Sequence, residues 1–265
     1  MDAMHLLYPS SPDNPNIPDE TFAEEFAAAK AAGLGCSLFS CEELELQRFK
    51  PKPALEEGAR VLYRGWMLTP AAYSYLHASI ASQGAIPITS PAQYRHCHHL
   101  PEWYPQCRDL TPATLVLPRD ADFAAALAEA GWSACFVKDY VKSLTTQRGS
   151  VAHNTDEVVE IIALIERYRG GLEGGICLRE FEPLIPETEE RYFVLDGRAH
   201  GRSDEVPALV HDIAQRVPCP FFSVDLVASE TGALRLVELG DGQVSDRKQW
   251  PAERFVVMLC SAVST

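Results

Sequence analysis

The sequence lacks any long apolar run. None of its apolar stretches approaches the roughly 18–20 residues that a membrane-spanning helix needs. Residues 1–10 have neither the basic start nor the long apolar stretch of a secretory signal. The eight cysteines include no Cys-x-x-Cys pair, and a chain of 265 residues is large enough to fold without disulfides. We therefore expect a protein of the reducing cytoplasm with no membrane partner.

Basic residues are also in short supply. Lys and Arg number 23 against 37 Asp and Glu, which gives a formal net charge of −14 at pH 7. This balance argues against sequence-independent binding to nucleic acid or anionic lipid, because both depend on basic surfaces. The hydrophobic content of 46% and the absence of low-complexity tracts indicate a sizeable core in one large domain or two small ones.

The stretch 221–245 contains the most informative pattern. Two segments rich in apolar and β-branched residues, Phe221–Ala228 and Ala233–Leu239, predict neighbouring strands. Gly232 lies between them and favours a tight turn. The stretch therefore predicts a β-hairpin.

Three carboxylates belong to this hairpin or follow it. Asp225 lies partway along the first strand, Glu238 near the end of the second, and Asp241 in the bend that comes next. Clustered carboxylates repel one another and resist desolvation, so a fold that gathers them usually needs a cation. Oxygen ligands alone favour Mg²⁺ or Mn²⁺, and Mg²⁺ often completes its shell with substrate phosphates, which points to a nucleotide. An ordinary surface hairpin with solvated acids is the alternative interpretation.

The first part of the chain alternates strand and helix patterns. Helices are expected from Asp19 to Gly33 and from Thr69 to Gly84, and they separate the predicted strands His5–Tyr8, Cys36–Phe39, Arg60–Arg64 and Ile86–Thr89. Such alternation favours a parallel sheet whose ligands gather at the carboxyl ends of the strands. Arg64 follows one of these ends, where it either holds a substrate anion or is paired structurally.

A second strand–helix series begins near Leu115. Asp120 is expected to cap a short helix that ends at Gly131, and the apolar strand that follows leads to Lys138 and Lys142. Asn154, with Glu157 three positions later, predicts the start of a long amphipathic helix.

From about Leu115 to the end, the order of features resembles the ATP-grasp family. A lysine strand, a polar loop, a helix, an interlobe strand, an arginine strand and an acidic hairpin follow one another in that family and here. In the family the last metal ligand is commonly the Asn of a Glu-x-Asn pair, whereas here Glu238-Leu239-Gly240-Asp241 places an acid one position later. This variant resembles a less studied branch whose members are mostly predicted ligases.

The resemblance implies a role for each matching residue. Nucleotide phosphates would meet Lys138, Lys142 and the loop 145–150 with Gly149 and Ser150, while the interlobe residues Glu180, Phe181 and Glu182 would hold adenine and ribose. Arg191 and Lys142 would act on the transferred phosphate, and Asp225, Glu238 and Asp241 would bind the metal. The candidates for the acceptor substrate are Arg64, Arg202, Gln243, Ser245 and Arg247.

One further segment contains possible metal ligands. Arg95-His96-Cys97-His98-His99, with Cys107 further on, offers nitrogen and sulfur ligands that suit zinc, but at no recognised spacing. A surface helix with packed cysteines and exposed histidines is the better interpretation.

We therefore expect an α/β protein with α+β organisation in its C-terminal lobes. An N-terminal α/β domain of residues 1–114 with a mainly parallel sheet would precede a two-lobed ATP-grasp domain of residues 115–265, with lobes of about 115–183 and 184–265. The resemblance implies a carboxylate–amine ligase that uses ATP and Mg²⁺, or Mn²⁺, to make an amide or peptide bond through an acyl phosphate. Its substrates would be small-molecule or peptide carboxylates and amines. A small-molecule kinase and a non-catalytic nucleotide-binding regulatory protein are the alternatives.

Overall fold

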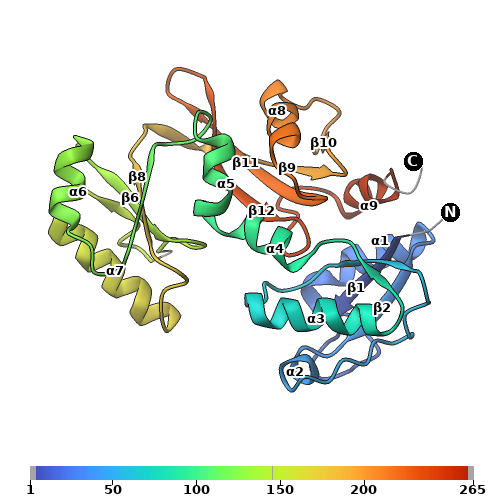
Figure 1. The fold of residues 1–265 in the computed structure, drawn as a ribbon. Coiled ribbons are helices and arrows are strands. Elements are labelled where there is room, and N and C mark those ends of the chain that lie inside the picture. The colour runs from blue at the N-terminus through green and yellow to red at the C-terminus, as the bar shows by residue number, and fades with distance from the viewer. Residues whose placement is uncertain (1–3, 145, 262–265) are drawn as a thin grey trace. The chain divides into compact units, whose positions relative to one another are not determined.

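A computed structural model describes residues 4–144 and 146–261 of the chain. Its contacts divide into two compact units, which we call unit 1 and unit 2 (Figure 1). Unit 1 comprises Met1–Arg95, Arg191–Val224 and Gly240–Thr265, and unit 2 comprises His96–Glu190 and Asp225–Leu239. Unit 1 thus takes residues from both sides of position 114, and the domain boundary inferred there stays a prediction.

The first sheet of unit 1 is entirely parallel, as predicted. Its order is β2-β1-β3-β4, with β1 at Met4–Pro9, β2 at Gly35–Phe39, β3 at Arg60–Tyr63 and β4 at Ile86–Pro87. The helices of this part are η1 (Glu20–Phe22), α1 (Ala23–Ala31), α2 (Cys41–Glu45) and α3 (Pro70–Ser82). α1 packs beside β2 and α3 beside β4 (Figure 1).

The starts of these helices follow the predicted caps. The carboxylate of Asp19 accepts a hydrogen bond from the Thr21 amide at 2.9 Å, and the hydroxyl of Thr69 accepts one from the Ala72 amide at 3.2 Å. Both side chains occupy backbone donors that a helix leaves unpaired at its first turn.

Unit 2 contains an antiparallel sheet of order β5-β8-β6-β7. Its strands are β5 (Thr114–Leu117), β6 (Cys135–Asp139), β7 (Val151–Ala152) and β8 (Ile176–Glu180). The helices α6 (Phe123–Ala130) and α7 (Thr155–Arg169) follow the predicted pattern. The cap of α6 was predicted wrongly, because Asp122 and not Asp120 accepts the Ala125 amide hydrogen bond, at 2.9 Å. Either acid suits a cap chemically, and only the position of the first helical turn decides between them.

A third sheet has the order β10-β9-β11-β12. It consists of β9 (Leu184–Leu195), β10 (Arg198–His200), β11 (Phe221–Ser229) and β12 (Leu234–Asp241). The two predicted turns are present: Asp196 and Gly197 have φ angles of 47° and 74°, and Gly232 has a φ of 83°. Asp-Gly is a favoured pair for such a tight turn because both of its central positions need positive φ. The parallel first sheet and these two sheets confirm the predicted α/β and α+β classes.

The remaining helices are α4 (Pro91–His98), α5 (Leu100–Cys107), α8 (Ala208–Arg216) and α9 (Ala252–Ser261). The helix α9 was not predicted from the sequence. Within the described residues, no helix combines the length and the apolarity needed to cross a bilayer.

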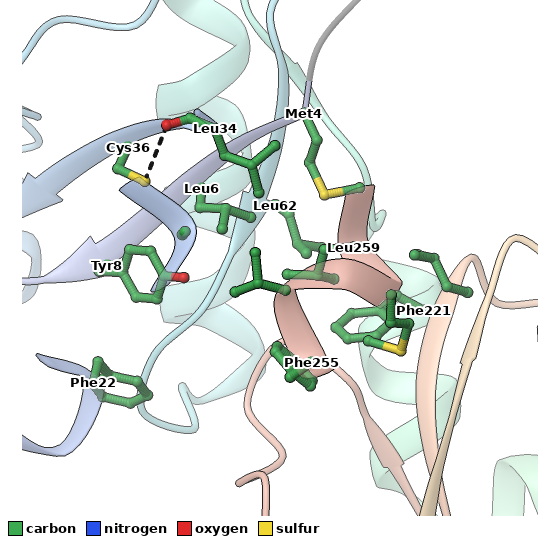
Figure 2. Close-up of a cluster of buried hydrophobic side chains, with 14 of the residues drawn as sticks. Met4, Leu6, Tyr8, Phe22, Leu34, Cys36, Leu62, Phe221, Phe255 and Leu259 are labelled. Carbon is green, nitrogen blue, oxygen red and sulfur yellow. Dashed lines mark hydrogen bonds between the residues drawn. The ribbon is translucent and has the colours of Figure 1, made fainter. Parts of the chain in front are cut away.

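One hydrophobic cluster of unit 1 joins the start of the chain to its end. Leu6 and Leu62 from the first sheet are buried together with Phe221 from β11 and with Phe255 and Leu259 from α9 (Figure 2). The first sheet therefore completes one of its faces with side chains from more than 150 residues later in the chain. In unit 2 a separate cluster packs the stripe of α7, with Val158, Ile161 and Ile165, against β6 and β8.

Candidate functional site

The pairing of β6 with β8 sorts their side chains onto two faces. Phe136 is opposite Arg179, and Lys138 is opposite Cys177. Successive side chains of a strand point to opposite faces, so Phe136, Lys138 and Arg179 share one face. The alternate residues, such as Val137 and Leu178, face α7 in the core of unit 2.

This face borders a pocket with a volume of about 450 Å³. Every lining residue belongs to unit 2. The apolar lining includes Phe136, Val151, Phe181 and Val227, and the charged lining includes Lys138, Arg179, Glu180 and Glu238. A mostly apolar cleft with a few convergent charged groups is typical of a site for a small organic ligand.

Lys138 is a buried cation in this pocket. Its Nζ lies 3.5 Å from Oε1 of Glu238, which is the acid near the end of the predicted hairpin. Burial lowers the pKa of Lys138, while the negative charge of Glu238 opposes this shift. A buried ammonium group with a single carboxylate at this distance is incompletely compensated and therefore favours a further anion.

Arg179 is a second buried cation, and it was not predicted from the sequence. Its Nη1 donates to the carbonyl oxygen of Val237 at 2.7 Å, and its Nη2 donates to Oγ1 of Thr111 at 2.6 Å. Its Nε has no hydrogen-bond partner among the described residues. Burial lowers the pKa of Arg179, and the charge of Glu238 acts in the opposite direction. The period of two along β8 is the signal that was available, since Arg179 alternates with the apolar residues Ile176 and Leu178 only if it leaves the core face.

The interlobe residues lie where the resemblance places them, but they differ in availability. Glu182 forms a two-point ion pair with Arg235, at 2.8 and 2.7 Å, so its carboxylate is already engaged. Phe181 is 48% exposed and lines the pocket, as does Glu180. Phe181 and Glu180 are therefore better placed than Glu182 to meet a ligand.

The polar loop after the lysine strand is held by its own hydrogen bonds. The hydroxyl of Ser150 is buried, accepts from the Leu144 amide at 2.8 Å and donates to the Leu144 carbonyl at 3.3 Å. Gly149 has a φ of 68°, which glycine adopts without strain. Thr145, part of the predicted phosphate loop, lies outside the described residues. Lys142 is exposed and does not line the pocket.

Asp139 fixes the turn that connects the two lysines. Its Oδ1 accepts from the amides of Val141 and Lys142 at 2.7 and 2.6 Å, and its Oδ2 accepts from the Glu173 amide at 3.2 Å and pairs with Arg169. This buried carboxylate lies on the core face of β6, directly behind Lys138. It holds the strand end that presents Lys138 to the pocket.

The three predicted metal ligands differ in environment. Asp225 is buried in β11, and the Glu238 side chain is 39% exposed in β12. Asp241 is fully buried, its Oδ1 accepts from the amide and the side-chain Nε2 of Gln243 at 3.0 Å each, and its Oδ2 has no partner among the described residues. Burial raises the pKa of Asp241 to about 7. In the described part of the chain, no group of three or more His, Cys, Asp or Glu side chains is placed to hold a metal ion. The metal role of these three carboxylates stays a prediction.

The departure from Glu-x-Asn has a local structural reason. A Cβ atom at Gly240 would lie 2.8 Å from Oγ of Ser245 and 2.9 Å from Oγ of Ser223. The two hydroxyls are hydrogen-bonded to each other at 2.7 Å, so they fill the space that a side chain at position 240 would need. An oxygen ligand after Glu238 has to come from another residue, and Asp241, with its unpartnered oxygen, fits that requirement.

The predicted acceptor residues are mostly engaged in contacts within unit 1. Arg64 is buried and forms a two-point ion pair with Glu25 at 2.8 Å. Gln243 is also buried, and its Nε2 donates to the hydroxyl of Tyr73 at 2.9 Å. Arg247 donates to the Trp250 carbonyl at 2.7 Å and pairs with Glu24, and Ser245 donates to the Asp241 carbonyl at 2.9 Å. These contacts favour structural roles for the four residues.

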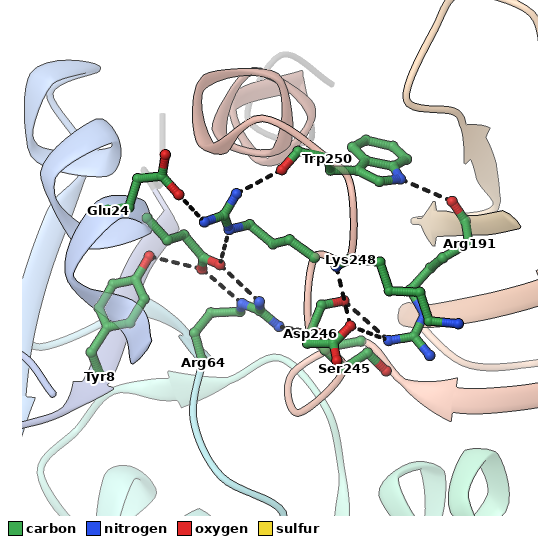
Figure 3. Close-up of polar contacts among 11 residues, drawn as sticks. Tyr8, Glu24, Arg64, Arg191, Ser245, Asp246, Lys248 and Trp250 are labelled. Carbon is green, nitrogen blue, oxygen red and sulfur yellow. Dashed lines mark hydrogen bonds and ion pairs between the residues drawn. The ribbon is translucent and has the colours of Figure 1, made fainter. Parts of the chain in front are cut away.

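The predicted catalytic Arg191 is also paired. Its Nη1 donates to Oδ1 of Asp246 at 2.8 Å and to the carbonyl of the same residue at 3.1 Å (Figure 3). Asp246 is largely exposed, so this pair is open to exchange with another anion. Arg202 is exposed.

The segment with possible zinc ligands forms parts of α4 and α5. Cys97 and Cys107 are fully buried, as the packing interpretation requires, and His99 lies 3.1 Å from Glu173. His98 is buried, so the expectation of exposed histidines was wrong for that residue. The described residues contain no metal-binding group here.

Comparisons with known proteins extend over the whole site. A family model described as an ATP-grasp domain, the third family of its clade, matches residues 89–259. A comparison with curated proteins finds no match. Among solved structures, a RimK domain protein ATP-grasp from Sphaerobacter thermophilus DSM 20745 is 17% identical, with 99% of this chain and 100% of that chain covered and a TM-score of 0.63.

Two further structures are similar over nearly their full length. The ATP-grasp ligase PsnB, complexed with a minimal precursor, Mg and ADP, is 15% identical, with 98% of each chain covered and a TM-score of 0.61. The D-cycloserine synthetase DcsG is 14% identical, with 98% of this chain and 99% of that chain covered and a TM-score of 0.59. At these identities the three structures establish a shared fold.

Proposed function

We propose, because this chain belongs to the ATP-grasp domain family whose model it matches, that it is an ATP- and Mg²⁺-dependent carboxylate–amine ligase. The observation that carries the proposal is the pocket of unit 2, where two buried cations, Lys138 and Arg179, share one face with apolar side chains. Buried cations in an apolar cleft match a nucleotide, which joins anionic phosphates to an aromatic base.

The pocket residues would divide the nucleotide between them. Lys138 and Arg179 would meet the phosphates, since a compact ammonium and a planar guanidinium both pair well with phosphate oxygens. Phe136 and Phe181 would pack against the base, and Glu180 would accept hydrogen bonds from the ribose hydroxyls. The backbone amide of Phe181 already donates to the Ala134 carbonyl at 3.1 Å, so its contribution to the pocket is the ring.

Glu238, Asp225 and Asp241 would hold the Mg²⁺ ion. The fit is supported by the buried, unpartnered Oδ2 of Asp241, because an uncompensated carboxylate in the interior is stabilised by a cation. When bound, Mg²⁺ neutralises charge on the phosphates of the nucleotide. Arg191 and Lys142 remain the proposed groups for the transferred phosphate.

The reaction would join a carboxylate to an amine. ATP would phosphorylate the substrate carboxylate, the amine would attack the acyl carbon, and phosphate would leave with its electron pair. PsnB is complexed with a minimal precursor, and the macrocyclase MdnC with the precursor peptide MdnA, while DcsG is a synthetase of the small molecule D-cycloserine. We therefore propose peptide or small-molecule carboxylates and amines as the substrates, with Arg202 as a candidate contact.

The first test is nucleotide binding. Calorimetric titration of the protein with ADP and Mg²⁺ should give a dissociation constant that Lys138→Met raises at least about tenfold, because a charge-assisted hydrogen bond contributes roughly 1.5–3 kcal/mol. Lys50→Met is the matched control, since Lys50 is an exposed lysine of unit 1. Equal affinity in wild type and Lys138→Met would contradict the assignment of the pocket.

The second test is turnover. Incubation with ATP, Mg²⁺ and a panel of carboxylates and amines should release ADP and free phosphate, and Glu238→Gln should lower that rate by orders of magnitude while the protein stays folded. A phosphorylated product without free phosphate would identify a kinase instead. Nucleotide binding without turnover over the whole panel would favour a regulatory protein.

A further inference from the structure

Arg64 is a buried cation that faces the loop after the acidic hairpin, and every group described below belongs to unit 1. It directly follows β3, and its guanidinium donates to both oxygens of Glu25 at 2.8 Å. Its Nη1 also donates to the carbonyl oxygens of Gly242 and Ser245, the latter at 3.0 Å. The ring of Phe255 lies 4.5 Å from the guanidinium carbon. Arg64 thus connects α1 to the loop that follows β12 (Figure 3).

Glu25 is the counter-charge of Arg64. It is 2% exposed, and it also accepts a hydrogen bond from the hydroxyl of Tyr8 at 3.1 Å. Nε of Arg247, from the same loop, lies 3.5 Å from its carboxylate. A buried carboxylate with three partners is compensated, so Glu25 holds Arg64 in one position without needing a ligand.

The loop held by Arg64 fixes the orientation of Asp241. The carbonyls bonded to Arg64 come one and four residues after Asp241. Between them, Gln243 donates to Oδ1 of Asp241 and is itself bound by unit 1, because its Oε1 accepts from the Tyr63 amide at 3.3 Å and its carbonyl accepts from the Gly65 amide at 3.1 Å. One oxygen of Asp241 is thereby occupied by donors, and Oδ2 is left without a partner in the described part of the chain.

We infer that Arg64, held by Glu25, is a positioning residue for Asp241, which it keeps oriented with Oδ2 available to a divalent cation. The inference rests on the proposed function, because it assigns Asp241 to the Mg²⁺ site. It also replaces the acceptor role considered for Arg64, since a guanidinium engaged by Glu25 and two carbonyls is not available to a substrate anion.

The test measures binding of Mn²⁺ in place of Mg²⁺. Free Mn²⁺ is followed by electron paramagnetic resonance during titration of the full chain in the presence of ADP, well below the unfolding temperature. Arg64→Met removes the donors to the loop while keeping an apolar side chain of similar length, and should raise the Mn²⁺ dissociation constant at least about tenfold, the usual effect of losing a residue that orients a metal ligand. Glu25→Gln keeps an acceptor for Arg64 but removes its counter-charge, and should raise the constant by a smaller factor.

Leu62→Ala is the control, because Leu62 is buried in the same strand and has no part in the hydrogen bonds to the loop. It should lower the unfolding temperature and leave Mn²⁺ affinity within about twofold of wild type, since a cavity costs stability and moves no ligand. Wild-type Mn²⁺ affinity in folded Arg64→Met, or in folded Glu25→Gln where Arg64→Met does not fold, would overturn the inference alone. Loss of affinity in Leu62→Ala equal to that in Arg64→Met would also overturn it. Absence of Mn²⁺ binding to the wild-type protein with ADP would overturn the proposed function and the inference together.

Discussion

Arg179 has more donor capacity than its partners use. The carbonyl of Val237 and the hydroxyl of Thr111 occupy its two terminal nitrogens, while its Nε is buried without a partner in the described residues. Glu238, the nearest opposing charge, is shared with Lys138, so two cations share one carboxylate. This surplus of buried positive charge gives the pocket its preference for an anion.

Arg179→Gln should therefore weaken ADP binding at least about tenfold, or roughly 1.4 kcal/mol, because the variant removes a buried charge that faces the ligand. Thr111→Val is the matched control, since it removes the hydroxyl that accepts from Arg179 and leaves the guanidinium in place. Calorimetric titration of both variants with ADP and Mg²⁺ separates the charge from the scaffold. A larger loss in Thr111→Val than in Arg179→Gln would mean that Arg179 acts only as a clamp for β12.

At the scale of elements, α7 shows how local sequence determines a boundary. The side chain of Asn154 accepts from the Glu157 amide at 3.0 Å and donates to the carboxylate of the same residue at 3.0 Å. The other oxygen of Glu157 accepts from the His153 amide at 2.9 Å. At the opposite end, Gly170 has a φ of 76°, which ends the helix. Both boundaries depend on contacts within a few residues, and both were predicted.

Asn154→Ala should lower the free energy of unfolding by about 1 kcal/mol, within the range of about 0.5–2 kcal/mol for a lost helix cap. Asn16→Ala, at an exposed asparagine, should change it by less than about 0.5 kcal/mol. Urea denaturation followed by circular dichroism measures both values. An unchanged midpoint in Asn154→Ala would show that packing of α7 alone fixes its start.

The predicted elements share a feature that the missed ones lack. Caps, turns and strand alternation are written in neighbouring residues, so the parallel sheet, α7 and both hairpin turns followed from the sequence. The engagement of Arg64 by Glu25 and by the Gly242 and Ser245 carbonyls joins residues 39 to 181 positions apart. No local pattern encodes such contacts, and the sequence left Arg64 open between a substrate ligand and a structural pair. The same reason explains why Lys138 is distinguished from Lys142 only by the pairing of β6 with β8.

On the scale of the whole molecule, unit 1 is assembled from distant parts of the chain. Phe255, Val256 and Leu259 of α9 are buried against side chains of the first sheet, including Leu6 and Leu62. Without them, one face of that sheet would expose its apolar residues to water. The fold of the first sheet therefore depends on the C-terminal helix.

Residues 1–114 expressed alone should consequently lack cooperative unfolding. Loss of the α9 side chains removes several buried large residues, each of which contributes roughly 1.5–3 kcal/mol, from a domain whose total stability is about 5–15 kcal/mol. Thermal denaturation followed by circular dichroism, together with the dispersion of amide signals in a nuclear magnetic resonance spectrum, tests this. A well-dispersed spectrum and a sharp transition would instead support an independent domain at 1–114.

Four histidines make the stability of the molecule depend on pH. Burial lowers the pKa of His5, His77, His96 and His200 below the usual 6.5. Nε2 of His96 and of His200 is buried and has no partner among the described residues. A proton on any of these rings would be poorly solvated in the folded protein, whereas the unfolded chain accepts it freely.

The free energy of unfolding should therefore fall as the pH drops below about 6.5, because the unfolded state then binds more protons than the folded state. Asp241 acts in the opposite direction between about pH 7 and the usual aspartate pKa of 3.8, since its raised pKa lets the folded state bind a proton that the unfolded state releases. Four histidines against one aspartate leave a net uptake of at most three protons, each worth about 1.4 kcal/mol per pH unit. Urea denaturation between pH 7.5 and 5.5 in EDTA, which keeps divalent ions from Asp241, measures the slope, and His5→Gln should reduce it. A free energy of unfolding that stays level or rises as the pH falls through this window would show that the four rings do not control it.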